Sequence, residues 1–426
     1  MYNDSRDTCA TKMTACSGVP AATDFRPRVI VVGGSQNALS VVRNLTRNGI
    51  EVFVINSPYE AVRFSRFGHY IQLDKSDTAA AWEEFLLGPH SEYLRGSVLL
   101  PCSDEAISIV VENYNALAKK FRLEETDPLV RAELLDKFAT YRRAKDVGIP
   151  AVSCWAIHSK EDFEQAIPEL CFPLIAKPLY APDRNVLKCA KAILFSDLAS
   201  LKLHVERAIR EEVGVVLMDY IPGGDDRLCS YFTYLDENGD PLVHFTKRVK
   251  RRFPLESGDG TYHVTAWIPE AAELGLRFFR HLNFRGLGNV EFKWDERDGK
   301  LKIIEANARF TASDCLIAKS GVNLALITYN RIVGIMQPAV MQFVESLALC
   351  RPLEDSFAAW QLHRKGELRL VDWLADLRRA NMVPFFEWRD PIPAVAALSR
   401  RLCKAGSRVL PWSRTADARP FLGVEK

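Results

Sequence analysis

Three polar residues alternate along one short segment, LKIIEANARF, which runs from Leu301 to Phe310. Glu305, Asn307 and Arg309 follow an apolar run that is typical of a buried strand. Alternate side chains of a strand lie on one face, so a carboxylate, an amide and a guanidinium would share a surface. Such oxygens suit Mg²⁺, and a guanidinium suits phosphate or carboxylate oxygens. Taken alone, the segment is more typical of an ion-paired edge strand.

A second acidic residue, Glu291 in the segment NVEF, lies on the strand before an Asp-Gly turn at 298–299. A two-residue turn would set Glu291 opposite Ala306 and point its side chain away from Glu305. A loop of three or five residues, or a β-bulge, would bring both carboxylates to one face. A metal site at Glu291 and Glu305 therefore requires one of these irregular registers.

Two lysines precede this hairpin in well-defined settings. Lys137 lies in LLDKFATYRRAKDVGIP, a predicted helix, and Lys177 ends the apolar strand FPLIAK. A lysine at the end of a strand is well placed to meet a phosphate as a point charge. A surface lysine that buries only its aliphatic stem is the alternative for each.

The segment LMDYIPG combines the end of a strand with a turn. Its backbone N–H and C=O groups suit the edge of an adenine ring, and an acidic residue just after the turn, Asp225 or Asp226, could accept from ribose hydroxyls. We select Asp226. The residues expected at the adenine edge are Met218, Asp219, Tyr220 and Ile221.

The run KRVKRR, from residue 247 to 252, is strongly basic. Alternation places Arg248, Lys250 and Arg252 on one face and Lys247 and Arg251 on the other. We favour the face of Arg248 and Arg252 as the one that meets an anion, although alternation alone does not decide between the two faces, and a solvated basic strand is the alternative. The run is short and has no interleaved aromatic residues, which argues against a nucleic-acid surface.

The predicted strands and helices form an α/β pattern in the first part of the chain and an α+β pattern after it. RVIVVGGSQNALSVVRNLTRNGIEVFVIN predicts a βαβ unit, but it lacks G-x-G-x-x-G and its second strand ends in Asn56, both unfavourable for dinucleotide binding. LPCSDEAISIV places Asp104 at a strand end, where open α/β sheets bind ligands or where the residue caps a helix. The later segments predict two hairpins and several helices.

Composition limits the remaining possibilities. The chain has 426 residues, a net charge of +2 and 48% hydrophobic residues, which is typical of a soluble protein of several domains. Its ten cysteines are scattered without zinc-ligand spacing, so we expect reduced thiols and a cytoplasmic location. No uninterrupted apolar run reaches transmembrane length, and residues 1–26 resemble a mobile tail rather than a signal peptide.

Six sequence features follow one another along the chain. In order, they are a lysine after an aspartate, a strand ending in Lys-Pro, a strand ending in Asp-Tyr-Ile-Pro-Gly, a basic strand, Val-Glu-Phe and Glu-x-Asn-x-Arg. The set resembles the ATP-grasp superfamily, especially its carboxylate–amine ligases. The resemblance implies an N-terminal α/β domain (27–125), an ATP-grasp domain (126–335) of two α+β subdomains that clamp ATP and meet near 217–222, and a helical C-terminal extension (336–426). It also implies phosphate-binding lysines at 137 and 177, the adenine hinge at 218–221, Mg²⁺ ligands Glu291, Glu305 and Asn307, and charge stabilisation by Arg309.

The resemblance implies an ADP-forming ligase that joins a carboxylate to an amine through an acyl phosphate. It also implies ATP and Mg²⁺ as cofactors, with two ions as the expected number and Mn²⁺ as the alternative metal. The family's lid over the phosphates is glycine-rich, whereas KPLYAPDRNVLKCAKAILF has no glycine. An ATP-binding regulatory relative without turnover is therefore one alternative, and a bicarbonate-using carboxylase or carbamoyl-phosphate-type enzyme is another. The expected partners are small carboxylates and amines, and homo-oligomer formation stays open.

Overall fold

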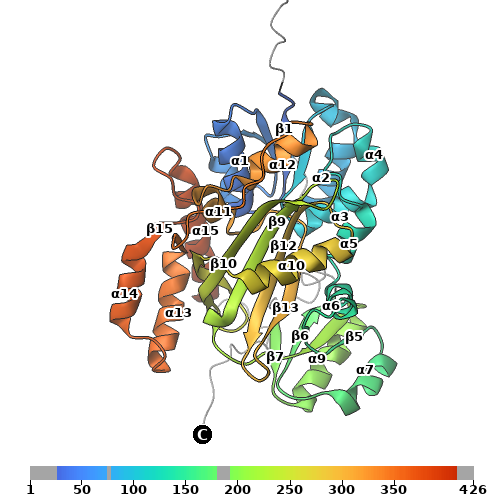
Figure 1. Ribbon diagram of the computed structural model, residues 1–426, viewed down its shortest axis with the longest axis vertical. Helices are drawn as coiled ribbons and strands as arrows, with labels where there is room; N and C mark the ends of the chain where they lie inside the picture. Colours follow the sequence, from blue (N-terminus) through green and yellow to red (C-terminus); the bar gives the residue numbers. More distant parts are fainter. Residues whose placement is uncertain (1–25, 74–77, 180–191, 410–426) are drawn as a thin grey trace, which may run out of the picture.

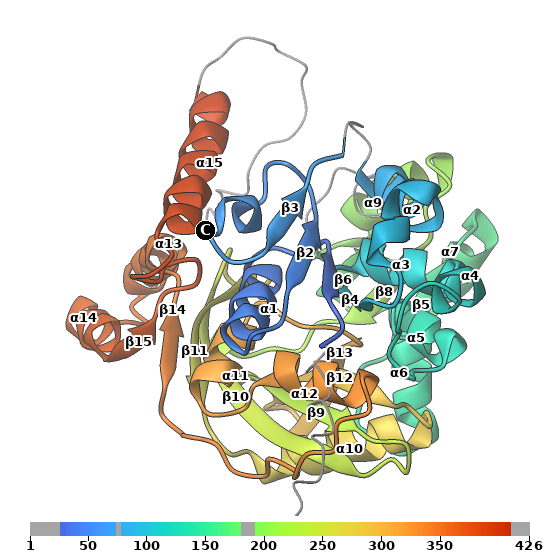
Figure 2. The ribbon, with the colours of Figure 1, turned by 90° about the horizontal axis from the view of Figure 1, so that it is seen from above.

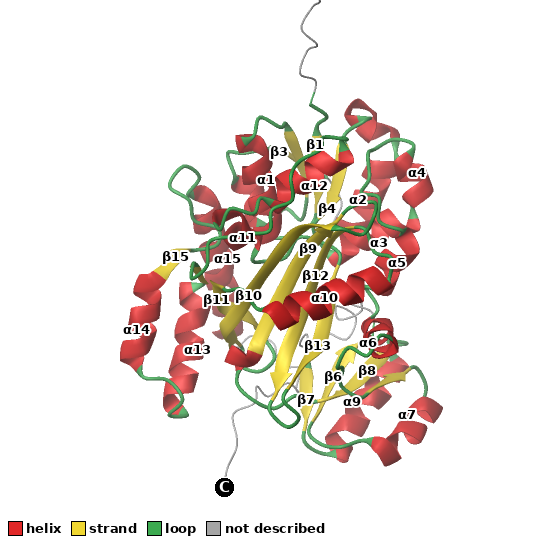
Figure 3. Ribbon diagram, viewed as in Figure 1, coloured by secondary structure: helices red, strands yellow, loops and turns green. Residues whose placement is uncertain are grey.

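The computed structural model describes residues 26–73, 78–179 and 192–409. These residues form three β-sheets with helices packed around them (Figures 1 and 3). The expected N-terminal tail and the segment expected to form the lid lie outside the described residues, apart from a few positions at their ends. The candidate site residues lie where these sheets and their helices meet.

The first sheet is parallel and has the strand order β3-β2-β1-β4. Its central strand β1, VIVV, is fully buried, as expected for a parallel sheet covered on both faces. The strands are β1 Val29–Val32, β2 Val52–Ile55, β3 His69–Ile71 and β4 Val98–Pro101; the helices are α1 Gln36–Arg47, α2 Thr78–Leu87, α3 Asp104–Glu112 and α4 Tyr114–Ala118, with 3-10 turns η1 Ala61–Phe64 and η2 Pro89–Leu94. The predicted βαβ unit at 29–55 is present.

The second sheet has the order β5-β8-β6-β7 and is antiparallel throughout. Helices α7 and α9 bury their apolar residues against it, including Phe163, Leu201 and Val205. The elements of this part are α5 Pro128–Glu133, α6 Lys137–Asp146, β5 Cys154–Ile157, α7 Lys160–Ala166, η3 Ile167–Glu169, β6 Leu174–Pro178, β7 Ile193–Phe195, α9 Leu198–Arg210 and β8 Val215–Asp219.

The third sheet has seven strands in the order β13-β12-β9-β10-β11-β14-β15. Helix α10 crosses it in Figure 1 and packs Phe278 and Phe279, both fully buried, into its core. The elements are η5 Asp225–Arg227, β9 Leu228–Leu235, β10 Pro241–Phe253, β11 Asp259–Thr265, α10 Pro269–His281, β12 Gly286–Asp295, β13 Lys300–Asn307, α11 Asp314–Lys319 and α12 Leu324–Ile332.

The β12–β13 hairpin has the irregular register that the metal hypothesis requires. Asp295 pairs with Lys300, so the loop has an even length, but the register shifts after Phe292 and Ile303 and sets Glu291 opposite Glu305. The extra residue is Ile304, whose carbonyl accepts a 2.8 Å hydrogen bond from the buried Tyr141 hydroxyl of α6. The predicted bulge is therefore confirmed, and a tyrosine from another element supports it.

The C-terminal extension contains helices, as expected, but also strands β14 and β15, which lengthen the third sheet. Short strands were not apparent in its sequence because three residues are too few for an alternating pattern. The elements are β14 Ala348–Cys350, α13 Pro352–Arg364, α14 Leu370–Arg379, β15 Ala380–Met382 and α15 Ile392–Val409. Within the described residues, none of the helices has the length and apolarity needed to cross a membrane.

Candidate active site

Two adjoining pockets share Glu305 and contain most of the predicted site residues. One is lined by Lys137, Asn307 and Asp104, together with Tyr141 and parts of β13. The other lies between the second and third sheets and is lined by residues of β6, β8, β10 and β12. Glu305 therefore joins the small pocket to the larger cleft.

The carboxylates of Glu291 and Glu305 face the same cleft. Asn307 is oriented by its neighbour Asn289, which is fully buried and uses its amide nitrogen to donate to the Tyr231 carbonyl at 3.0 Å. The remaining Asn289 oxygen accepts from the Asn307 amide nitrogen at 3.4 Å. The oxygen of Asn307 is thereby left to accept a ligand.

These three side chains fit a magnesium ion that shares its coordination with a phosphate. They supply two carboxylates and one amide oxygen, all hard donors on one face of a hairpin. The part of the chain that the structure describes contains no cluster of three or more His, Cys, Asp or Glu residues able to enclose a metal ion. Mg²⁺ usually binds to one or two carboxylates and completes its octahedron with water and phosphate oxygens.

Arg309 continues the same face beyond the end of β13. Its Nε donates to Asp104 Oδ1 at 2.6 Å, and Asp104 is the first residue of helix α3, which follows strand β4 of the first sheet. Burial lowers the pKa of Arg309, but Asp104, Glu305 and Glu291 more than offset this and raise it above its usual value. The guanidinium is thus a permanent cation held beside the two carboxylates by the N-terminal part of the chain.

The two predicted lysines lie in different pockets. Lys137 begins α6, where Asp136 caps the helix, and lines the small pocket with Glu305. Lys177 lies on β6 and lines the larger cleft with Glu291. Both expected positive charges therefore adjoin the carboxylate pair from separate sides.

All four residues of the predicted hinge, at 218–221, line the larger cleft. The Asp219 and Tyr220 N–H groups already donate within the second sheet, to Ser153 and Pro173. Lys293 donates to the Ile221 carbonyl at 2.8 Å and to the Gly223 carbonyl at 2.9 Å, which fixes the turn. Burial and the nearby Arg252 lower the pKa of Lys293 to about 8.

Asp226 does not occupy the predicted position. It is exposed on the short turn η5 and does not line the cleft, whereas its neighbour Asp225 is buried. Asp225 forms an ion pair with Arg252 at 2.5 Å and is therefore already engaged. Glu256, on the loop between β10 and β11, does line the cleft and is the acid that sequence analysis missed.

The basic strand β10 also differs from the prediction. Arg248 pairs with Cys229, whose other neighbour is the buried core residue Phe292, so Arg248 lies on the face opposite the site. Lys247 pairs with Ser230, which pairs with Glu291, so Lys247 shares the face of the carboxylates. Simple alternation failed because β10 has register shifts between residues 249 and 252, and these bring Arg252 into the cleft.

Lys247 is an unusual buried cation. It is 3% exposed, and its ammonium lies 3.1 Å from Ser230 Oγ and 3.3 Å from His263 Nδ1. No carboxylate among the described residues lies within ion-pair distance of it. Burial lowers its pKa, while the more distant Glu291 raises it. A buried ammonium with only neutral partners suits an anion that arrives with the ligand.

Comparison with known proteins supports the fold. A scan of protein-family models finds no match. The structure is similar to N5-carboxyaminoimidazole ribonucleotide synthetase in complex with ADP, with a TM-score of 0.59, 12% identity and coverage of 76% of this chain and 81% of that one. It is also similar to the L-amino acid ligase of Bacillus licheniformis, with a TM-score of 0.55, 16% identity and coverage of 75% and 76%.

Two curated relatives are similar in sequence. The D-aspartate ligase of Enterococcus faecium is 22% identical over 57% of this chain and 60% of its own length. The C-terminal section of the carbamoyl phosphate synthase large chain of Methanopyrus kandleri is 26% identical over 71% of this chain and 62% of its own length. The chain thus spans less than two thirds of the length of these relatives. The structure therefore has the ATP-grasp fold, as the resemblance implied.

Proposed function

We propose that the protein is an ATP-dependent ligase that joins a carboxylate to an amine through an acyl phosphate. The observation that carries the proposal is the bulged pairing of Glu291 with Glu305, which gathers two carboxylates beside Arg309 and between Lys137 and Lys177. This set can neutralise a transferring phosphoryl group and needs no nucleophile from the protein. Relatives of the chain include a D-aspartate ligase and a D-alanine–D-alanine ligase.

ATP fits the larger cleft with its adenine at 218–221 and its phosphates towards Glu291 and Glu305. Glu256 is placed to accept from the ribose in the role first assigned to Asp226. Lys137 and Lys177 would contact phosphate oxygens, and Glu291, Glu305 and Asn307 would hold Mg²⁺, with Mn²⁺ as an alternative and two ions as the expected number. The metal would neutralise phosphate charge.

In this mechanism the substrate carboxylate attacks the γ-phosphate, ADP leaves, and the amine then displaces phosphate from the acyl phosphate. Arg309, held by Asp104, would orient the carboxylate and stabilise charge on the transferred group. Lys247, and not Arg248, would be the second cation that faces the transferred group. Arg252 lies farther along the cleft. Catalysis would therefore depend on positioning and charge neutralisation.

The first experiment is a screen for ADP release. Purified protein with Mg-ATP is offered pools of amino acids, other small carboxylates and amines, and the positive pools are divided until one acid and one amine remain. The proposal expects release that requires both substrates. Release that requires bicarbonate instead would support a carboxylase or carbamoyl-phosphate-type reaction.

A second function is favoured by one feature of the sequence. The expected lid segment has no glycine to let backbone N–H groups approach the phosphates. An ATP-binding regulatory protein would keep the cleft and lose turnover. Tight Mg-ATP binding by calorimetry, with no ADP release from any pool, would favour this function over the ligase.

A further inference from the structure

A groove of about 590 Å³ lies between α1, α11 and the segment from Ala380 to Arg389. This volume is within the range of about 300–1,000 Å³ that is typical of small-molecule sites. The groove shares no lining residue with the two pockets of the ATP cleft. In Figure 2, α1 stands between the C-terminal extension and β4, β6 and β8. We propose that this groove binds a small anion built on a planar heteroaromatic ring.

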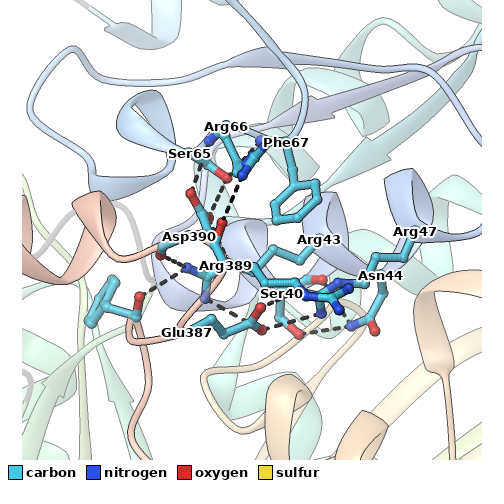
Figure 4. Close-up of polar contacts among 11 residues, drawn as sticks. Ser40, Arg43, Asn44, Arg47, Ser65, Arg66, Phe67, Glu387, Arg389 and Asp390 are labelled. Atoms are coloured by element: carbon cyan, nitrogen blue, oxygen red, sulfur yellow. Dashed lines mark hydrogen bonds and ion pairs between the residues drawn. The ribbon is translucent and has the colours of Figure 1, made fainter.

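The wall formed by the C-terminal extension is fixed by a buried ion pair. Arg43 of α1, 5% exposed, donates from Nε to Asp390 Oδ2 at 2.9 Å and from a terminal nitrogen to the Phe385 carbonyl at 3.0 Å. Asp390, 1% exposed, also accepts from Ser65 Oγ at 2.7 Å and from the Arg66 N–H at 3.0 Å (Figure 4). The groove is thus preformed, which lowers the entropic cost of binding.

The groove carries two cations in excess. The charges of Arg43 and Arg47 are balanced by Asp390 and Glu387, with which they form ion pairs. Lys319 and Arg389 also line the groove, and within the described ranges their side chains form neither ion pairs nor hydrogen bonds. Two unbalanced positive charges on opposite walls favour an anionic ligand.

Two aromatic rings stand at the groove with large exposed surfaces. The rings of Phe386 and Trp388 meet edge to face, with centroids 5.0 Å apart and an interplanar angle of 77°. Trp388 is 89% exposed and Phe386 38% exposed. An indole usually buries much of its surface, so this exposure leaves an aromatic face available to stack on a planar ring.

An amide side chain to which no described residue hydrogen-bonds lines the same groove. Gln36, the first residue of α1, is 9% exposed, and no described residue hydrogen-bonds to its side chain. Its amide can donate and accept at once, which matches the edge of a heteroaromatic ring. Burial raises the pKa of the nearby Cys315 to about 12, so this thiol stays protonated and the site is suited to binding rather than covalent chemistry.

The ligand chemistry is therefore a planar ring with heteroatoms at its edge and a negative group a short distance away. A nucleoside monophosphate and a heteroaromatic carboxylate share this chemistry, and AMP and nicotinate are suitable probes for them. Inorganic phosphate supplies the charge without the ring and is the matched control ligand.

Calorimetry on the full chain tests the proposal, with saturating Mg-ADP present to fill the ATP cleft. AMP or nicotinate should bind, and the double variant Lys319→Ala/Arg389→Ala should weaken that binding by at least about tenfold. The charge-matched double variant Lys160→Ala/Lys202→Ala, on exposed positions of α7 and α9, should bind as the wild type does. Trp388→Phe should retain binding but lose most of the ligand-induced fluorescence change.

Binding of AMP alone would assign the site to a nucleotide, and binding of nicotinate alone to a carboxylate. The proposal is overturned if neither probe binds with a Kd below about 1 mM. It is also overturned if inorganic phosphate binds as tightly as the ring-bearing probes, or if Lys319→Ala/Arg389→Ala leaves affinity unchanged. None of these results depends on ATP turnover.

Discussion

At the scale of single residues, Glu305 is the side chain on which both pockets converge. Replacing it with Gln keeps its shape but removes one charge from the metal site. We expect Glu305→Gln to lower the rate of ADP release by at least about 100-fold. The variant would hold Mg²⁺ less well, and the negative charge of the transferring phosphoryl group would then lose the cation that neutralises it. Release is measured with a coupled assay, and thermal unfolding without nucleotide should be nearly unchanged.

Glu296→Gln is the matched control for this prediction. Glu296 lies in the loop of the same hairpin and forms an exposed ion pair with Arg227. It should retain wild-type turnover. If Glu305→Gln released ADP as fast as Glu296→Gln, the metal assignment would be wrong.

Replacing Lys247 should affect activity and stability in different directions. Its buried ammonium lies beside the neutral groups of Ser230 and His263 and over the Phe232 ring, so replacing it with Met removes a desolvated charge from the fold. We expect Lys247→Met to have an equal or higher Tm but at least about tenfold slower ADP release. A lower Tm together with full activity would show that the lysine is structural.

The lowered pKa of Lys293 makes the stability of the protein depend on pH. Its pKa of about 8 in the folded protein lies below the ordinary lysine value of 10.5, so between these values the unfolded chain binds the additional proton. The destabilising contribution of the buried charge is full below pH 8 and is relieved as the pH rises towards 10.5. Relative to Lys293→Met, wild-type protein should gain on the order of 2 kcal/mol of unfolding free energy between pH 7 and 9.5. Urea unfolding of both proteins at the two pH values measures this, and a constant difference would contradict it.

At the scale of elements, the basic strand β10 anchors the C-terminal extension. Arg251 is 2% exposed and donates to both oxygens of Asp355 on α13, at 2.9 and 3.1 Å, and to Asp376 on α14 at 2.6 Å. Arg251→Met would leave two buried carboxylates without this partner and should cost about 3–5 kcal/mol. Hydrogen exchange should become faster in α13 and α14 first.

Arg248→Met on the same strand is the control. Because Arg248 is exposed on the face away from the carboxylates, its loss should change stability by less than about 0.5 kcal/mol and should leave ADP release intact. Equal exchange rates in the Arg251→Met variant and the wild type would show that the ion pairs do not hold the extension. Loss of activity in Arg248→Met would show that Arg248 acts in the site, as the sequence first predicted.

The sequence predicted regular elements better than their irregularities. Alternation identified Glu305, Asn307 and Arg309 as one face, and the need for a bulge followed from the position of Glu291. Lys293 could have been found in the same way, since it is two residues from Glu291. In contrast, Arg248 was preferred to Lys247 because alternation separates two faces without showing which one lines the site. Nothing in KRVKRR marks the register shifts between residues 249 and 252, which bring Arg252 to the cleft. The inward turn of Asp225 instead of Asp226 depends on its ion pair with Arg252, which only the folded chain brings near.

At the scale of the whole molecule, the site depends on contacts between parts that are distant in sequence. Tyr141 of α6 supports the bulge at Ile304, and Asp104 of α3 holds Arg309. Arg43 of α1 binds Asp390 of the extension and completes the separate groove. Motif order predicted the fold and gathered the candidate site residues on one face, whereas the extension and its groove have no sequence pattern from which their placement could be read.

The central claim is that ATP activates a carboxylate as an acyl phosphate. Hydroxylamine traps such an intermediate as a hydroxamate and does not require the natural amine to be known. With Mg-ATP, hydroxylamine and the carboxylate pools, we expect hydroxamate and ADP to form in equal amounts, and Glu305→Gln to abolish both. ADP release without hydroxamate in every pool, or no ADP release at all, would contradict the claim.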